Sequence, residues 1–283
     1  MDKEHQQIPN KNPIGVFDSG VGGLSVMREI ARLLPHEDIL YFADSANCPY
    51  GPRPPEEIRR LSRGIVEFLL GQGAKIVVVA CNTASAAALS YLRQSFAVPI
   101  VGMEPAVKPA AAITRTRKVG VIATPVTFQG ELFARLVERF AANVEVHTQV
   151  CPNLVGRVEA GLLDDAETEE LLRKYLTPLL KAGIDSLVLG CTHYPFLREA
   201  IERVVGPRVT VIDPSPAVAR QVGRVLEREG LEGPRHRRGQ HVFYTTGDPA
   251  AFAAMVERLI GERGQVRGAR WEEGGGLTLL RWP

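Results

Sequence analysis

KIVVVACNTASAAAL, from Lys75 to Leu89, combines a buried strand, a cysteine and the start of a helix. The run IVVVA is short, apolar and β-branched, which is typical of a parallel strand covered on both faces. Asn82 and Thr83 follow where a small-residue helix begins, and we expect Thr83 to cap that helix. The Cys81 thiol is therefore predicted at the carboxyl end of a strand, where open α/β sheets bind ligands, and beside a helix N-terminus that favours a thiolate.

The same arrangement occurs a second time in DSLVLGCTHYPFL, from Asp185 to Leu197. Cys191 follows Cys81 by 110 residues, and it again ends an apolar run and precedes polar residues. A weaker match relates IGVF at Ile14 to VGVIA at Val119, an offset of 105 residues. Two offsets of similar size predict two related α/β halves that face each other, each contributing one loop and one thiol.

Composition narrows the class of protein. The chain has 283 residues, 45% hydrophobic and 23% charged, which fits a globular protein of up to two domains. A net charge of +2 gives no reason to expect nucleic acid or a membrane as partner. The four cysteines are too sparse for a disulfide framework and lack zinc-site spacing. The polar N-terminus lacks the apolar core of a signal sequence, so we expect a disordered lead-in over residues 1–11 and a cytoplasmic protein with free thiols.

Two loops invite other interpretations. The glycines of DSGVGGLSV nearly match a dinucleotide-binding fingerprint, with Asp44 in place of its acidic ribose ligand, but the third glycine is missing. Asp18 and Ser19 alone would be interpreted as a helix-capping pair. The proline-rich loop DSANCPYGPRPPEE could cover a pocket with Tyr50 and Gly51 or simply connect two elements, and Cys48 within it is interpreted as incidental.

Four chemistries could use the two cysteines. A nucleophilic hydrolase could pair Cys191 with His193, but it leaves Cys81 without a role. A redox dithiol usually occurs as CxxC, and a metal site would want more histidines or cysteines nearby. Inversion of a stereocentre, by contrast, needs an acid on one face of a carbon and a base on the other. Thiols suit that reaction because their pKa of about 8.5 makes both protonation states accessible.

Six motifs then identify a resemblance. In chain order these are FDSGVGGLSV, YFADSANCPYG, VACNTASA, VIATPVTF, LGCTHYPFL and IDPSPAVA. Together they closely resemble glutamate racemases, cofactor-independent bacterial isomerases that supply D-glutamate for peptidoglycan and hence for the cell wall and cell shape. The resemblance covers about residues 14–222, FYTTGDPAAF is similar to the family's C-terminal strand and helix, and the PYG loop is more similar to glutamate than to aspartate or hydantoin racemases.

The resemblance implies a fold and a mechanism. The fold is α/β, with two pseudo-symmetric flavodoxin-like domains, each a mostly parallel sheet flanked by helices, and the active site between them. Residues 12–105 plus 216–270 would form the first domain and 106–215 the second, with 271–283 a tail of unknown structure. By family analogy Cys81 abstracts the α-proton of D-glutamate and Cys191 that of L-glutamate, without pyridoxal phosphate or metal.

The resemblance also assigns supporting residues and partners. Asp18 would assist Cys81, while Glu159 and His193 would assist Cys191. Asp18 and His193 would also contact substrate, and the other substrate-binding positions are Ser19, Pro49, Tyr50, Gly51, Asn82, Thr83 and Thr192, with Thr124 added for its place at the repeated strand end. Glutamate is the expected partner, and a homodimer is the expected assembly. Two alternatives stay open: a racemase of aspartate or another acidic amino acid, and a small-ligand-binding protein whose cysteines are structural.

Overall fold

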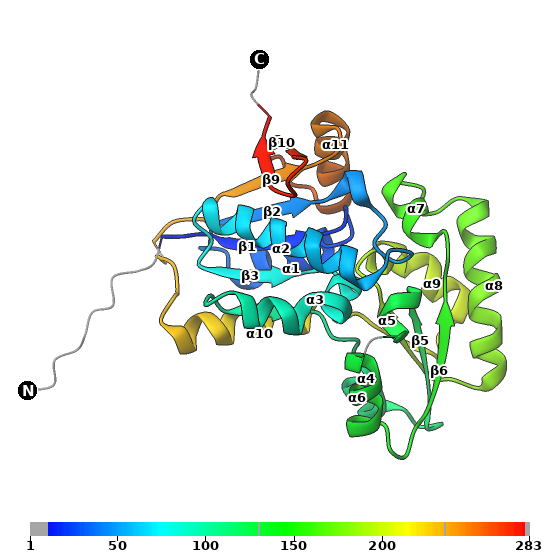
Figure 1. Ribbon diagram of the computed structural model, residues 1–283. Helices are drawn as coiled ribbons and strands as arrows, with labels where there is room; N and C mark the ends of the chain where they lie inside the picture. Colours follow the sequence, from blue (N-terminus) through cyan, green and yellow to red (C-terminus); the bar gives the residue numbers. More distant parts are fainter. Residues whose placement is uncertain (1–10, 130, 235, 281–283) are drawn as a thin grey trace, which may run out of the picture.

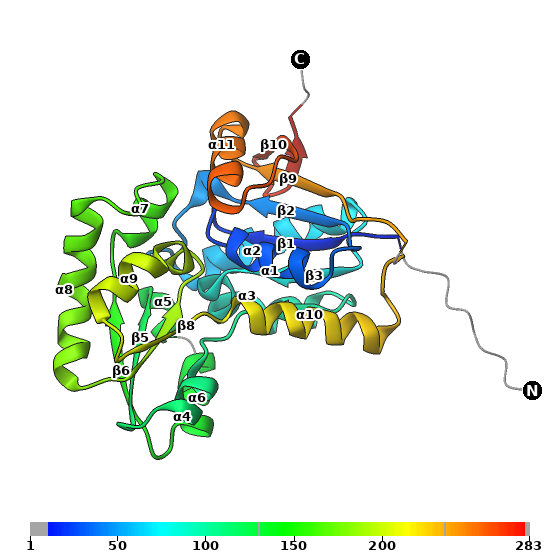
Figure 2. The ribbon, with the colours of Figure 1, turned by 180° about the vertical axis from the view of Figure 1, so that it is seen from behind.

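A computed structural model describes residues 11–129, 131–234 and 236–280 of the chain. It contains two sheets, seen side by side in Figures 1 and 2. The first runs β11-β10-β9-β2-β1-β3-β4 and the second β6-β5-β7-β8. The first four strands of the chain and the next four are thus arranged in the same 2-1-3-4 order, and every pairing among them is parallel. The predicted pair of pseudo-symmetric flavodoxin-like halves is confirmed.

The strands are short and apolar because helices cover both faces of each sheet. Those of the first sheet are β1 (Ile14–Asp18), β2 (Ile39–Ala43), β3 (Ile76–Val79), β4 (Ile100–Gly102), β9 (His241–Thr245), β10 (Gln265–Trp271) and β11 (Leu277–Leu279). Those of the second are β5 (Lys118–Ala123), β6 (Glu145–Val150), β7 (Ser186–Gly190) and β8 (Thr210–Ile212). Every residue of β1, β3 and β7 is buried, so these strands lie at the centre of the protein.

Two helical layers enclose the first sheet. Its helices are α1 (Leu24–Leu33), α2 (Pro55–Gly71), α3 (Asn82–Ser95), α10 (Ser215–Glu229) and α11 (Pro249–Ile260), with the 3-10 turn η1 (Ser45–Asn47). Helices α2 and α3 pack together on one face, and α1 packs against α10 and α11 on the other (Figures 1 and 2). Because α10 follows the last strand of the second sheet but packs on the first, the chain crosses between the two sheets twice.

The second sheet is enclosed in the same way. Its helices are α4 (Val107–Ile113), α5 (Pro125–Gln129), α6 (Glu131–Phe140), α7 (Leu154–Glu159), α8 (Ala166–Ala182) and α9 (Arg198–Val205), with the 3-10 turn η2 (Tyr194–Leu197). One hydrophobic cluster runs from β1 and α1 through Tyr194 to α8 and α9, so the two halves share part of their core. The division of the chain into two domains at the predicted boundaries stays a prediction. No helix of the described residues is both long and apolar enough to cross a membrane.

Two local expectations were wrong, and one alternative is excluded. Helix α3 is capped by Cys81 rather than Thr83, since the Sγ atom of Cys81 accepts the Ala84 N–H at 3.4 Å. The alternative interpretation of Asp18 and Ser19 as a helix-capping pair is excluded, because the N-cap of α1 is Gly23. The segment after Cys191 does not enter an α-helix directly, because Pro195 lies in the 3-10 turn η2 that precedes α9.

The predictions for the two ends of the chain have different outcomes. Most of the tail expected at 271–283 is described: β11 pairs antiparallel with β10, which extends the first sheet beyond β9. Residues 281–283 lie outside the described residues. So does nearly all of the predicted lead-in, since the description begins at residue 11.

A buried ion pair between Lys75 and Glu37 fixes the amino ends of β3 and β2, and its loss should be costly. The two groups are 2.6 Å apart with side chains 1% and 7% exposed, and Glu37 also accepts the Gly233 N–H. We expect Lys75→Met to lower the free energy of unfolding by about 3–5 kcal/mol, because it leaves a buried carboxylate without its cation. Urea denaturation measures the loss.

The matched control is Arg32→Met, which removes an ion pair to Glu29 in which the arginine side chain is 69% exposed. That change should cost less than about 1 kcal/mol. If Lys75→Met and Arg32→Met lowered the free energy of unfolding equally, the buried ion pair would not have the importance assigned to it.

Candidate active site

Cys81 and Cys191 line one small closed cavity between the carboxyl ends of the two sheets. Cys81 follows β3 and Cys191 follows β7, and the thiol residues are only 4% and 6% exposed. The rest of the lining is Ser19, Pro49, Tyr50, Gly51, Asn82, Thr83, Thr124, Val155, Thr192 and His193. Its volume of about 10 Å³ is roughly the space of one water. A ligand larger than a water molecule therefore needs the cavity to widen before it can bind.

The structure brings together almost all the residues predicted from sequence. Every predicted substrate-binding position lines the cavity except Asp18, which hydrogen-bonds the lining residues Ser19 and Thr192. Glu159 lies behind His193 and contacts it. Val155 also lines the cavity and was not predicted, since an apolar residue in a helix gives no sequence signal for a binding site.

Two hydrogen bonds join the sheets beside the thiols. Thr192, next to Cys191, donates its hydroxyl to the Asp18 carboxylate at the end of β1, at 2.8 Å. Thr83, near Cys81, lies 2.8 Å from the hydroxyl of Thr124 at the end of β5. Because β1 corresponds to β5 and β3 to β7 in the repeated strand order, these two bonds are related by the pseudo-symmetry of the fold. All four residues are buried, and we call the two bonds the cross-sheet pairs.

The Asp18 carboxylate is held in a fixed orientation. It accepts the Gly20 N–H at 2.9 Å and the Ser19 hydroxyl at 3.1 Å in addition to the Thr192 hydroxyl. Burial raises the pKa of Asp18, and the positive charge of His193 together with these hydrogen bonds opposes that rise. Asp18 is thus a buried acid whose proton affinity responds to its neighbours on both sheets.

Cys81 is held in its thiol form by its surroundings. Burial raises the pKa of the Cys81 thiol, and the nearby Asp18 carboxylate raises it further. The Ala84 N–H at the start of α3 opposes this rise, since it stabilises negative charge on sulfur. With these influences combined, the closed site favours a protonated Cys81 that can donate a proton.

Cys191 faces a different environment, formed by His193 and Glu159. The Nδ1 atom of His193 lies 3.6 Å from the Cys191 Sγ, and its Nε2 atom lies 2.6 Å from Oε1 of Glu159. Burial alone would lower the pKa of His193, but hydrogen bonds to Cys191, Cys48 and Glu159 raise it well above its usual 6.5. Burial alone would raise the pKa of Glu159, but the contact with His193 lowers it. Cys191 therefore lies beside an imidazole that its hydrogen bonds keep protonated.

The glycine-rich turn after β1 makes the close packing around His193 and Glu159 possible. A Cβ on Gly22 would lie 2.4 Å from Nδ1 of His193, and a Cβ on Gly20 would lie 2.0 Å from Oε1 of Glu159. The Val21 N–H in the same turn donates to that Glu159 oxygen at 2.8 Å. These glycines serve the contact between the two halves, and nothing in their geometry requires a nucleotide.

Asn82 is the clearest sign that the cavity binds a polar ligand. Its residue is 3% exposed, and neither its Oδ1 nor its Nδ2 atom has a hydrogen-bond partner among the described residues. Buried amide groups are seldom left unsatisfied, because the loss of their hydration is costly. Since Asn82 also lines the cavity, a ligand that both donates and accepts hydrogen bonds would satisfy it.

Cys48 was wrongly interpreted as incidental. Its Sγ atom lies 3.5 Å from Oε1 of Glu159, and burial raises its pKa to about 11. Glu159 lies 111 positions away in the sequence, so no local pattern could have indicated this contact. Cys48, Glu159 and His193 also form the kind of group that can bind metal.

A resident metal does not fit this group of three side chains as it stands. Two zinc ligands at about 2.0–2.2 Å from the ion are roughly 3.3 Å apart in a tetrahedron. The 2.6 Å between Glu159 and His193 is shorter, and it is the length of a charge-assisted hydrogen bond. The pair is therefore built to share a proton.

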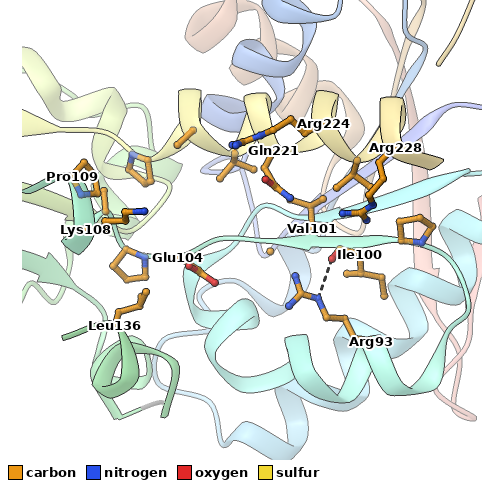
Figure 3. Close-up of a pocket in the computed structure, with 18 of the residues that line it drawn as sticks. Arg93, Ile100, Val101, Glu104, Lys108, Pro109, Leu136, Gln221, Arg224 and Arg228 are labelled. Carbon is orange, nitrogen blue, oxygen red and sulfur yellow. Dashed lines mark hydrogen bonds between the residues drawn. The ribbon is translucent and has the colours of Figure 1, made fainter. Parts of the chain in front are cut away.

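A much larger cavity, of about 830 Å³, lies away from the thiols (Figure 3). It is bordered by the end of α3, β4, α4 and α10, and Arg93, Lys108 and Arg224 are among its labelled residues. The Arg93 Nε atom donates to the Ile100 carbonyl at 3.1 Å. None of its lining residues is a cysteine or histidine, so size alone does not locate the candidate active site.

Two mostly parallel sheets thus bring a pair of buried thiols to one cavity, and one thiol is backed by a histidine and a carboxylate. The chain belongs to the Asp/Glu/Hydantoin racemase family, whose model matches residues 14–222. It is 54% identical over 247 residues to the glutamate racemase of Herpetosiphon aurantiacus, covering 87% of this chain and 97% of that protein. The predicted resemblance to glutamate racemases is confirmed.

Solved structures agree with the sequence comparison. A glutamate racemase isoform of Bacillus anthracis superposes with a TM-score of 0.83 and 38% identity, covering 91% of this chain and 97% of that one. The glutamate racemase of Francisella tularensis, solved in complex with D-glutamate, has a TM-score of 0.80 and 31% identity, covering 93% and 98% of the two chains.

The protonation of His193 can be measured directly. We expect its imidazole to titrate above its usual 6.5 in the folded protein, and Glu159→Gln to lower that midpoint because it removes one cause of the rise. Since the folded-state pKa is raised, the stability that the His193 proton contributes is complete below about pH 6.5 and is lost as pH rises through the folded value. NMR of histidine-labelled protein measures both midpoints, with the His193 signal assigned from its absence in His193→Gln. A wild-type midpoint at or below 6.5 would contradict the site as described.

Proposed function

We propose that this protein interconverts L-glutamate and D-glutamate and so supplies D-glutamate for peptidoglycan, and that Cys81 and Cys191 are its acid and base. The observation that carries this proposal is that two thiols, one from each sheet, line a single closed cavity. The glutamate racemases of several bacteria are similar along most of their length, and the Francisella structure was solved with D-glutamate.

The proposed reaction begins from unlike thiols. With L-glutamate bound, the Cys191 thiolate takes the α-proton, and the electron pair of the broken C–H bond stays on the α-carbon. Cys81, a thiol in the closed site, then donates its proton to the opposite face of that carbon to give D-glutamate. Cys81 is left as thiolate and Cys191 as thiol, which is the state required for the reverse reaction.

Neighbouring groups would set these protonation states. His193 carries positive charge beside Cys191, and Glu159 keeps the imidazolium charged. Asp18 lies on the Cys81 side, where its own raised pKa allows it to exchange a proton with that end of the site. We propose Cys81, Cys191, Asp18, Glu159 and His193 as the catalytic set.

The carbanion and the substrate carboxylates need fixed hydrogen-bond donors, because the α-proton is very weakly acidic. Asn82 supplies an unsatisfied amide and Thr83 a hydroxyl beside Cys81, whereas the Thr192 hydroxyl, which donates to Asp18, offers its oxygen as an acceptor. We propose that these three and Ser19, Pro49, Tyr50, Gly51, Thr124, Asp18 and His193 hold the substrate. Exclusion of water from so small a cavity would strengthen each of these interactions.

Catalysis without pyridoxal phosphate or metal is part of the proposal. The residues that line the cavity include no lysine to form a Schiff base, and the 2.6 Å between Glu159 and His193 suits a proton better than a metal. A homodimer in the cytoplasm, expected from the family resemblance, also remains a proposal.

The decisive experiment is incubation of the purified protein with L-glutamate in D₂O without added cofactor. We expect deuterium at Cα of the D-glutamate formed, because solvent-exchanged thiols donate the new proton. Cys81→Ala and Cys191→Ala should each lower kcat by at least about 100-fold, the usual contribution of an acid–base group.

The matched control is Cys151→Ala. Cys151 is equally buried but does not line the cavity, so this variant should keep activity close to wild type. Inversion that depended on added pyridoxal phosphate, normal racemisation by both cysteine variants, or turnover of aspartate in preference to glutamate would contradict the proposed function.

A further inference from the structure

The C-terminal hairpin of β10 and β11 contains none of the active-site motifs. It nevertheless contacts a hydrogen-bond network that holds a residue of the cavity lining. Trp271 is the last residue of β10, and its indole N–H donates to the Oδ1 atom of Asp44 at 2.8 Å. Asp44 follows β2 at the same sheet edge as Asp18 and Cys81. The hairpin therefore reaches the ligand-binding edge of the first sheet.

Asp44 is a buried carboxylate held by neutral donors. It is 0% exposed, and it accepts hydrogen bonds from Tyr50 at 2.6 Å, Trp271 at 2.8 Å, Thr246 at 2.9 Å and the Asn47 amide at 3.1 Å. No ion pair found among the described residues includes Asp44. A buried carboxylate without a cation depends on its hydrogen bonds, so the loss of any one donor weakens the whole arrangement.

Tyr50 connects this carboxylate to the cavity. The residue is 1% exposed and lines the cavity beside Cys81 and Thr83. Its hydroxyl points away to Asp44, at 2.6 Å, so Asp44 fixes the position of the ring and of the Pro49–Gly51 segment around it. Trp271 and Tyr50 thus donate to the same side chain from opposite ends of the chain.

The indole of Trp271 is itself held firmly. A Cβ on Gly64 of α2 would lie 2.7 Å from its ring, so the helix leaves a recess that the indole fills. Trp271 and Leu277 of the hairpin pack against the hydrophobic cluster that contains Tyr50 and Cys81. The donor to Asp44 therefore sits on a rigid element, as a positioning group requires.

We propose that Trp271 is a positioning residue for glutamate binding, acting through Asp44 on Tyr50; this inference rests on the proposed function. Trp271 does not touch the cavity. Loss of its N–H leaves Asp44 less restrained, which lets the Tyr50 segment move away from the substrate. Because Tyr50 holds substrate and transfers no proton, affinity should suffer more than the chemical step.

The test compares Trp271→Phe, Tyr50→Phe and the double variant for kcat and KM in both directions. It also compares their Kd for D-glutamate, measured by calorimetry. We expect Trp271→Phe to raise KM and Kd about 5- to 10-fold with kcat changed less than about 2-fold, because only part of the effect of losing one hydrogen bond to a charged group passes through Tyr50 to the substrate. The double variant should be no worse than Tyr50→Phe alone, since both changes break the same link.

Thr278→Val is the matched control, because it removes a hairpin hydroxyl that bonds only the exposed Glu272. It should leave KM and Kd unchanged. The inference would be overturned if Trp271→Phe had normal KM and Kd, even if its melting temperature fell. Additive effects of the two substitutions on Kd in the double variant would also overturn it. The Kd for D-glutamate can be measured without turnover. If the wild type binds glutamate but does not racemise it, the proposed function is wrong, and the Kd values of the variants still decide the role of Trp271. A wild type that does not bind glutamate overturns both.

Discussion

The cross-sheet pairs, Asp18 with Thr192 and Thr83 with Thr124, are the constraint on which the site depends. Each is a buried hydrogen bond of 2.8 Å that joins the carboxyl end of a strand in one sheet to a threonine one or two residues after a cysteine in the other. Parallel strands bring their carboxyl ends to the same edge of a sheet, and that is the edge at which open α/β sheets bind ligands. The cross-sheet pairs join these two edges beside a cavity that both thiols line.

The two halves have similar backbones, but the charged groups around their two cysteines differ. Burial and the Asp18 carboxylate raise the pKa of the Cys81 thiol, whereas Cys191 lies 3.6 Å from the Nδ1 atom of His193, an imidazole whose pKa is raised well above its usual value. An inverting site needs that difference, because the two groups must start a turnover in opposite protonation states. In the proposed mechanism Glu159 and His193 supply this difference, and Asp18 is the only comparable residue proposed for the first half.

The sequence predicts those parts of the fold and site that depend on local patterns. Buried strands ending in Cys81 and Cys191 were predictable because apolar runs followed by polar residues mark strand ends, and the family resemblance supplied Glu159. The helix cap was mistaken because a cysteine is an uncommon cap, and the apolar strand gave no sign of which side chain would meet the Ala84 N–H. The contacts of Cys48 with Glu159 and of Trp271 with Asp44 were missed because each joins residues more than 100 positions apart in sequence. Contacts of that kind come from the packing of strands, which local spacing does not encode.

A structure with glutamate bound tests the central claim most directly. The account predicts a less closed cavity than the one of about 10 Å³ seen here, with the α-carbon between the two sulfur atoms. Each Sγ atom should lie about 3–3.5 Å from the α-carbon on opposite faces, the separation of reacting groups before proton transfer. Glutamate bound with both sulfurs on one face of the α-carbon, or with one of them beyond reach, would contradict a reaction in which Cys81 and Cys191 act as acid and base.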